Sequence, residues 1–334
     1  MSAMDARAVS TPVREAAAAR PRWQIVLIRP ELVTLLLLIG ATLAASRLSP
    51  FFADVSFIFE SATYYIELAI AALMLTIVII SGEIDLSPAA QMALSACLFA
   101  TVHRVGWPMG IAMGASVLSG LLMGALNGVF VTVLRLPSII VTIGTLTLYR
   151  GLAQVLAGDK SIGKFPRWFV GIDYRTVGIV PVPVLIFLAV SIALGLFLGV
   201  TVYGRQIYQI GTSEIAAIHA GIRVRRIKMA LFVATGLVSS LAGLLTASRL
   251  GTVRYDLAAG GELTMVLIVM LGGTYIFGGR GSILGTFLAV WLLVIIATGM
   301  TVANIAINAQ LTVMGLLLIA SIIATNAIYA RSQR

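Results

Sequence analysis

Two carboxylates lie in the short sequence GEIDLSP, residues 82–88, which interrupts a long apolar passage. Gly82 precedes the carboxylates Glu83 and Asp85, and Pro88 closes the stretch. Ionisable groups at membrane depth couple ions or contact a substrate, and a carboxylate can also cap a helix that starts beside it. The role open to GEIDLSP therefore depends on the elements that position it.

Two further charged residues, Glu67 and Arg150, lie within other apolar segments. They can neutralise each other in a structural pair, or they can form polar contacts along a substrate path. A proton-driven or sodium-driven carrier needs titratable or coordinating groups in mid-membrane. Because mid-membrane carboxylates are nearly absent, the sequence argues against proton coupling.

Motifs of enzyme chemistry are missing from the sequence. There is no phosphate-binding loop, no G-x-S-x-G elbow and no H-E-x-x-H zinc motif. Cys97 is the only cysteine, which excludes an intramolecular disulfide and a cysteine metal cluster, and His103 and His219 are far apart. We therefore predict that the chain is not an enzyme and holds neither a metal nor a cofactor. Energy for uphill transport must then come from a partner or from an ion gradient.

Composition identifies the elements that carry these residues as membrane-spanning helices. The chain has 334 residues, of which 60% are hydrophobic and 11% charged, and its mean hydropathy is +1.04. A span needs roughly 20 apolar residues, and long unbroken runs exclude a barrel. We predict an all-α, polytopic membrane fold with about ten spans, at residues 31–47, 58–81, 89–106, 109–134, 138–157, 181–203, 229–248, 263–279, 283–303 and 307–328.

The basic residues orient these spans. With Arg150 inside a span, fourteen of the 23 basic residues fall on the side of the N-terminus and eight on the other side. Lys and Arg are enriched on the cytoplasmic side, so both termini are predicted to be cytoplasmic. Proximity to anionic membrane lipid then accounts for the net charge of +10 without nucleic-acid binding. Residues 1–24 are expected to form a polar cytoplasmic tail without the apolar core of a signal peptide, and residues 25–330 the membrane domain.

In this arrangement GEIDLSP lies at the cytoplasmic end of the second span. Gly82 relaxes the backbone, Asp85 or Ser87 can cap the next helix, and Pro88 suits its first turn. A capped break between two helices explains these residues, and a position beside the translocation path near an inner gate is the functional interpretation. The sequence suggests no structural role for Glu83 as strong as those of the other residues in this stretch.

Residues 204–228 form the longest polar insertion on the cytoplasmic side. Thr212 or Ser213 is a good N-cap, Glu214 suits the first turn of a helix, and Gly221 is a natural stop. The resulting two-turn helix is too short to be stable alone, so its flanking spans and a partner must hold it. The alternative is an interfacial helix that lies on lipid.

Four segments of the sequence carry a family resemblance. GEIDLSP, LPSIIVTIGTLTLYRGLA, GRQIYQIGTSEIAAIHAGI and GGELTMVLIVMLGGTYIFGGRGSILGT together resemble permease subunits of bacterial sugar-type ABC importers. These are the ribose, xylose, rhamnose and autoinducer-2 permeases within the branched-chain and monosaccharide permease family. The resemblance runs collinearly from about residue 31 to 328. The family's usual motif is closer to GGIDLSVG, so Glu83 replaces a glycine and Pro88 a valine.

The resemblance implies a type II importer fold, an inner-membrane location and three kinds of protein partner. These partners are a second permease subunit in a homodimer or heterodimer, a cytoplasmic ATPase that uses ATP and Mg, and a periplasmic sugar-binding protein. It also implies that the cytoplasmic helix couples to the ATPase, with Ala216, Ala217 and Ala220 allowing close approach. The residues assigned to this coupling are Thr212, Ser213, Glu214, Ile215, Ala216, Ala217, Ile218, Ala220 and Gly221. Gly82, Glu83, Asp85, Ser87, Glu67 and Arg150 are assigned to the translocation path or gate.

The outer loop, residues 158–180, mixes basic and aromatic residues. Trp168 and its neighbours can anchor the loop at the membrane boundary. Alternatively, Lys164, Arg167 and Trp168 receive the acidic rim of the binding protein.

The predicted function is to form the pathway of an ATP-driven importer for a monosaccharide or a related small polyol. A rhamnose-type or autoinducer-2-type substrate is the finer expectation. The alternative is a secondary carrier or channel that works alone on a small neutral solute. Neighbouring genes for an ATPase with two nucleotide domains and for a secreted binding protein would distinguish the two.

Overall fold

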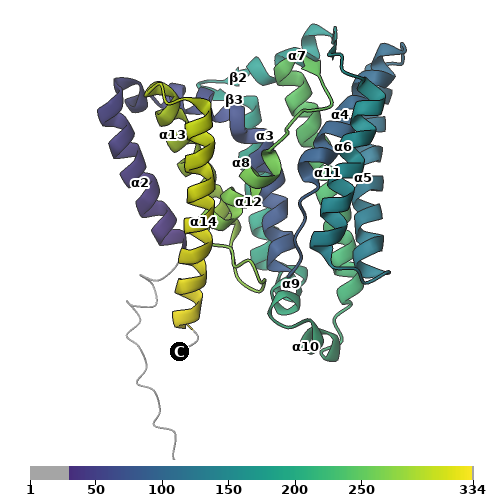
Figure 1. Ribbon diagram of the computed structural model, residues 1–334, viewed down its shortest axis with the longest axis vertical. Helices are drawn as coiled ribbons and strands as arrows, with labels where there is room; N and C mark the ends of the chain where they lie inside the picture. Colours follow the sequence, from purple (N-terminus) through teal and green to yellow (C-terminus); the bar gives the residue numbers. More distant parts are fainter. Residues whose placement is uncertain (1–29, 333–334) are drawn as a thin grey trace, which may run out of the picture.

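The computed structural model describes residues 30–332, and these fold almost entirely into helices (Figure 1). The elements in chain order are α2 (Pro30–Leu48), the 3-10 helix η1 (Pro50–Ala53), α3 (Val55–Ile80), α4 (Pro88–Arg104), α5 (Met109–Thr132), α6 (Ser138–Ala157), β1 (Ile162–Gly163), α7 (Arg167–Tyr174), β2 (Thr176–Val177), β3 (Val180–Pro181), α8 (Val182–Val200), α9 (Val202–Thr212), α10 (Glu214–His219), α11 (Val224–Leu250), β4 (Thr252–Val253), α12 (Gly261–Leu271), α13 (Ile283–Val302) and α14 (Ile307–Ser332).

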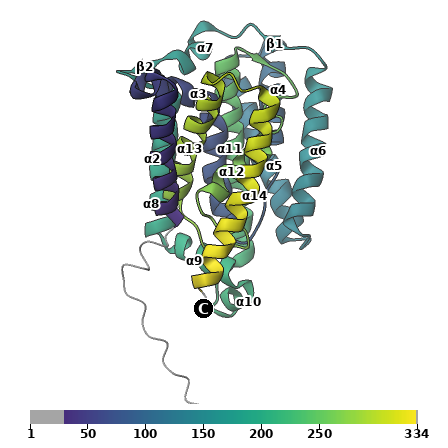
Figure 2. The same cartoon turned by 60° about the vertical axis from the view of Figure 1, so that its left-hand side comes forward.

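Eight of these helices are long and apolar enough to cross a membrane, namely α2, α3, α5, α6, α8, α11, α13 and α14. They run roughly side by side (Figures 1 and 2). The predicted third span corresponds to α4, whose 17 residues reach about 25 Å. The all-α, multi-pass prediction is confirmed.

The predicted eighth span, 263–279, is wrong as a full crossing. Helix α12 has only 11 residues, which reach about 16 Å, whereas a bilayer core is about 30 Å thick. The helix ends because Gly273 adopts a φ of +80° directly after Gly272. The chain then continues as a loop, residues 272–282, before α13 begins.

Helix α3 forms the centre of the bundle. In its most apolar stretch 78% of the residues are buried inside the chain, against 11% for α2 and α14 at the periphery. Helices α5 and α11 approach closely because Gly120 and Gly124 face Gly236 and Phe232, where an added Cβ would overlap the opposing backbone. Small residues at helix contacts are typical of membrane bundles, where close packing replaces the hydrophobic effect.

The two ends of the bundle differ. One end carries α7 and the short strands, where β1 pairs antiparallel with β4 through Ile162 and Val253. The opposite end carries α9, α10 and the C-terminal end of α14 (Figures 1 and 2).

Candidate functional site

The short helix α10 lies at the end opposite α7, and its start and stop follow from local sequence. Ser213 is the N-cap, and its Oγ accepts a hydrogen bond from the backbone N of Ala216 at 3.3 Å. Of the two predicted caps, Thr212 instead ends α9, where its Oγ1 donates to the carbonyl oxygen of Tyr208. Gly221 has a φ of +79° and follows the last turn, as predicted for the stop.

The two faces of α10 differ in exposure. Ile215 is 71% exposed and Ile218 is 55% exposed, while Ala217 is only 3% exposed. Ala217 joins the hydrophobic core of its own chain. The expectation that Ala217 lets a partner approach is therefore wrong, because its face of the helix is already covered. The face that remains available carries Ile215, Ala216 and Ile218.

A buried ion-pair cluster joins α10 to the GEIDLSP segment. The Lys228 Nζ lies 2.5 Å from Glu83 Oε1 and 2.6 Å from Glu214 Oε2. The side chains of Lys228 and Glu83 are 8% and 13% exposed, and that of Glu214 is 50% exposed. Lys228, in the second turn of α11, thus connects the first turn of α10 to the break that follows α3, 145 positions away in sequence.

This cluster supplies the role that the sequence did not reveal for Glu83. The sequence shows Lys228 only as one of several basic residues in the insertion, and nothing in its local pattern indicates a carboxylate partner 145 positions away. One signal of such a partner is the carboxylate at position 83, where the family usually has a glycine. A buried carboxylate requires a cation nearby.

The break between α3 and α4 is held in an extended form by its neighbours. Gly82 turns the chain with a φ of +86°. The backbone N of Ile84 donates to Ser138 Oγ at 3.1 Å, and the carbonyl oxygen of Ile84 accepts from Thr142 Oγ1 at 3.3 Å. Both partners belong to α6, so the break is fixed against the start of that helix.

Asp85 caps the turn before α4 rather than the helix itself. Its Oδ1 accepts hydrogen bonds from the backbone N and the Oγ of Ser87, at 2.9 and 2.6 Å. Ser87 is the N-cap residue of α4, but its side chain makes no capping hydrogen bond, which corrects the predicted role. Pro88 occupies the first helical position, as predicted.

A buried polar chain continues from this turn into the bundle. Ser87 Oγ accepts from Gln91 Nε2 at 2.7 Å and from Asn127 Nδ2 at 2.8 Å. Asn127 Oδ1 in turn accepts from the Tyr149 hydroxyl at 2.9 Å. Helices α4, α5 and α6 are therefore linked to the break through Ser87.

A second connection to the break runs through backbone contacts between glycines. The backbone N of Gly279 donates to the carbonyl oxygen of Ile80 at 2.8 Å. A Cβ added to Gly211 would overlap that same carbonyl oxygen and the Gly279 nitrogen, and one added to Gly278 would meet the Gly82 backbone. The ends of α3 and α9 and the loop 272–282 thus meet where no side chain fits. No local pattern in the sequence predicts this junction.

Glu67 and Arg150 do not form the pair that the sequence suggested. Glu67 Oε1 instead accepts from Arg249 Nε at 2.6 Å, and the Glu67 side chain is 2% exposed. Arg150 Nη1 donates to the carbonyl oxygens of Tyr255 and Leu257 at 3.0 and 2.6 Å. Neither residue contacts the Lys228 cluster. Each has hydrogen-bond partners elsewhere in the bundle.

The α7 end carries the residues assigned to binding-protein docking. Lys164, Arg167 and Trp168 are all exposed, at the start of α7 and in the loop before it. Next to them, burial raises the pKa of Asp173 on α7, and the charge of Arg249 partly offsets that rise. Docking at this surface stays a prediction.

The geometry at the α10 end offers a physical connection between elements and no catalytic arrangement among the residues described. An exposed apolar helix face is tied by Lys228, and by the glycine contacts beside α9, to a break in the most buried helix. Such an arrangement suits a contact with a partner that moves.

Comparison with known proteins gives a consistent result. Residues 57–322 match the model of the family described as branched-chain amino acid transport system, permease component. The relatives include the proteins named autoinducer 2 import system permease protein LsrD of Escherichia coli K12 and of Shigella flexneri. Each is 33% identical over 309 residues, which cover 91% of this chain and 94% of the relative. No solved structure matches the chain.

The family match covers most of the bundle, including the three residues of the Lys228 cluster. The chain therefore belongs to the permease component family of branched-chain amino acid transport systems, and it is a multi-pass transport subunit of an ABC importer rather than an enzyme.

Proposed function

We propose that this chain forms the translocation pathway for a small polyol together with a second permease subunit. A cytoplasmic ATPase docks on α10, and a periplasmic binding protein delivers the substrate at the α7 end. The observation that carries the proposal is the Lys228 cluster, because it links the exposed face of α10 to the break at residues 82–88.

The exposed face of α10 supports docking on a protein. A helix of six residues is not stable by itself in water, and here its cap and the Glu214–Lys228 pair hold it in place. Ile215 and Ile218 are both more than half exposed on this rigidly held turn. A groove in a partner would bury that apolar area.

Lys228 supports transmission from the docked helix to the break. Its ammonium group donates to both carboxylates, and charge-assisted hydrogen bonds of this length are stronger than neutral ones. A displacement of Glu214 therefore displaces Lys228 and Glu83, and Gly82 provides the flexible position beside them. Gly82, Glu83, Asp85 and Ser87 are accordingly proposed at the inner gate.

The remaining gate candidates are proposed as structural. Glu67 is neutralised by Arg249, and Arg150 holds the segment between β4 and α12 through two carbonyl oxygens. Both contacts are made within the chain itself, and neither involves the break at residues 82–88.

The proposed orientation places both termini in the cytoplasm. The α10 end gathers Arg205, Arg223, Arg225, Arg226 and Lys228, as the positive-inside bias requires of a cytoplasmic face. The C-terminal end of α14 lies at this same end (Figure 1).

The proposed substrate class is a monosaccharide or a related small polyol, with an autoinducer-2-type molecule as the first choice. The support is the identity of 33% to autoinducer 2 import permeases over nearly the whole chain. The test is uptake of labelled autoinducer-2 by cells that express the chain with its ATPase and its binding protein.

We expect the uptake to need both partners. Excess unlabelled autoinducer-2 should reduce it more than excess ribose does. Stronger competition by ribose would contradict the autoinducer-2-type substrate while leaving the monosaccharide class and the importer intact. Full uptake without the ATPase would instead favour a carrier that works alone.

A further inference from the structure

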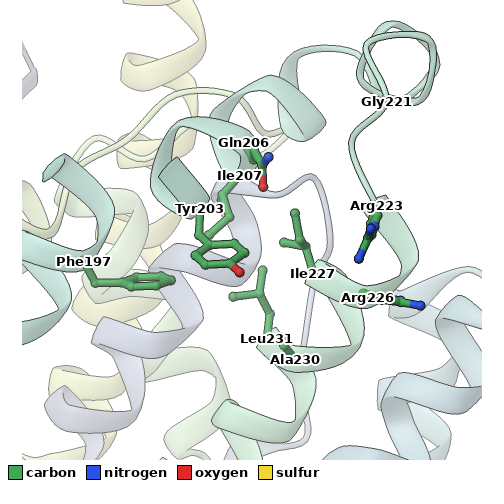
Figure 3. A pocket seen from close by; sticks show the side chains of 10 residues that line it. All are labelled: Phe197, Tyr203, Gln206, Ile207, Gly221, Arg223, Arg226, Ile227, Ala230 and Leu231. Atoms are coloured by element: carbon green, nitrogen blue, oxygen red, sulfur yellow. The ribbon is translucent and has the colours of Figure 1, made fainter. Parts of the chain in front are cut away.

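A pocket of about 570 Å³ lies between the end of α8, the start of α9 and the first turns of α11. The residues that line it are apolar on one side and basic on the other. Phe197, Ile227 and Leu231 form an apolar part, and Arg223 and Arg226 stand at the other side. Figure 3 shows the Phe197 ring and the two guanidinium groups at opposite ends of the pocket, with the remaining side chains between them.

The two arginines carry charge that the chain does not neutralise within its described residues. Arg223 and Arg226 are exposed, and neither forms an ion pair or a side-chain hydrogen bond with any residue between 30 and 329. The neighbouring Arg225 differs, because its Nε donates to the carbonyl oxygen of Thr132. The pocket therefore offers two guanidinium groups to an anion.

The polarity of the pocket changes over the thickness of a lipid headgroup region. Arg226 and Leu231 are five positions apart on α11, which corresponds to about 7.5 Å along the helix axis. The headgroup region on each side of a bilayer is about 5–8 Å thick, and the acyl chains follow directly beneath it. An amphiphile with its anionic group at Arg223 and Arg226 would thus place its first methylenes against Leu231 and Phe197.

We propose that this pocket binds one anionic phospholipid from the cytoplasmic leaflet. Basic pockets between membrane helices on the cytoplasmic side suit such headgroups, and the apolar part of the wall distinguishes a lipid from a free anion. The assignment to the cytoplasmic leaflet rests on the orientation proposed above. A lipid held here would brace the start of α11 against α9, and Arg226 lies only two positions before Lys228.

The test measures binding of phosphatidylglycerol to the purified full-length chain by native mass spectrometry, with phosphatidylcholine as the neutral comparison. The variant Arg223→Gln/Arg226→Gln should bind phosphatidylglycerol roughly 30-fold more weakly, the factor expected for two charges near a membrane surface. The matched control is Arg205→Gln, an exposed arginine on α9 outside the pocket, which should change the affinity about twofold or less. All variants remove exposed side chains, and retained thermal unfolding temperatures will confirm that they fold.

A second variant tests the apolar part of the pocket. Ala230 is exposed and lines the pocket, so Ala230→Trp would fill the space for the acyl chain without changing the charge. We expect it to weaken phosphatidylglycerol binding as well. Unchanged lipid binding by Ala230→Trp, together with displacement of the lipid by inorganic phosphate, would overturn the proposal in favour of a free-anion site.

Equal affinity of the double variant and Arg205→Gln would also overturn the proposal. If the double variant kept the lipid but lost the partner ATPase, the pocket would belong to a protein interface instead. The lipid measurement uses no ATPase, so failure of the proposed α10 docking would leave its result unchanged.

Discussion

At the scale of single residues, the buried charges are best understood through their partners. Lys228 is nearly buried and lies between Glu83 and Glu214, and Glu67 is nearly buried beside Arg249. A buried charge without a partner is costly, whereas a paired one is tolerated. The partners distinguish the two kinds of buried charge: Glu67 joins two long helices, whereas Lys228 reaches a half-exposed carboxylate on α10.

The Glu67–Arg249 pair gives a direct prediction on stability. Arg249→Met leaves the Glu67 carboxylate buried without its cation, and loss of one partner of a buried pair costs about 3–5 kcal/mol. We expect a clearly lower thermal unfolding temperature in detergent, with most of the loss restored in Glu67→Gln/Arg249→Met. The control is Arg254→Met, which breaks the solvent-exposed pair with Asp256 and should lower stability far less. Equal effects of Arg249→Met and Arg254→Met would show that the Glu67 pair does not stabilise the bundle.

At the scale of elements, α10 combines a fixed position with an uncovered face. Its cap, its stop and the buried Ala217 hold it against the chain, while Ile215 and Ile218 point outward. The adjoining break at residues 82–88 is fixed to α6 and to the buried polar chain through Ser87. One element is thus exposed to a partner, and the other is set deep in the bundle.

This arrangement predicts the effect of a charge on the exposed face of α10. Ile218→Asp would place a carboxylate in the proposed apolar contact with the ATPase, where its desolvation is costly, while the chain itself loses little packing because Ile218 is 55% exposed. We expect the ATPase to co-purify at least tenfold less with this variant. The matched control is Val177→Asp at the opposite end, where the side chain is 65% exposed. Normal recovery of the ATPase with Ile218→Asp would remove α10 as its docking element.

The elements also show what the sequence could predict. The predicted helix at 214–220 and the observed α10 at Glu214–His219 nearly coincide, because caps and stops are local signals. The predicted span at 263–279 failed because hydropathy continues through Gly272 and Gly273 although the helix ends there. The partners of Glu83 and Glu67 lie 145 and 182 positions away, and only the packing of the helices brings such residues together.

At the scale of the whole molecule, the bundle connects two ends with different surfaces. The α7 end presents exposed basic and aromatic residues, the α10 end presents an exposed apolar helix, and the largely buried α3 runs between them (Figure 1). The break that follows α3 contacts α6, α9 and the loop 272–282. Lys228 therefore connects α10 to this break, and the glycine contacts connect α9 to it.

The most direct test of this account is the amount of substrate imported per ATP hydrolysed by the complete transporter in liposomes. Lys228→Met removes the link between Glu214 and Glu83, while the Ser213 cap and the buried Ala217 still hold α10 with Ile215 and Ile218 available for docking. We expect ATP hydrolysis within about threefold of the unaltered complex and import per ATP reduced at least tenfold, because the ATPase still binds but no longer moves the break. Lys228→Arg keeps the charge and should retain most of the import. Unchanged import per ATP by a well-folded Lys228→Met complex would contradict the account.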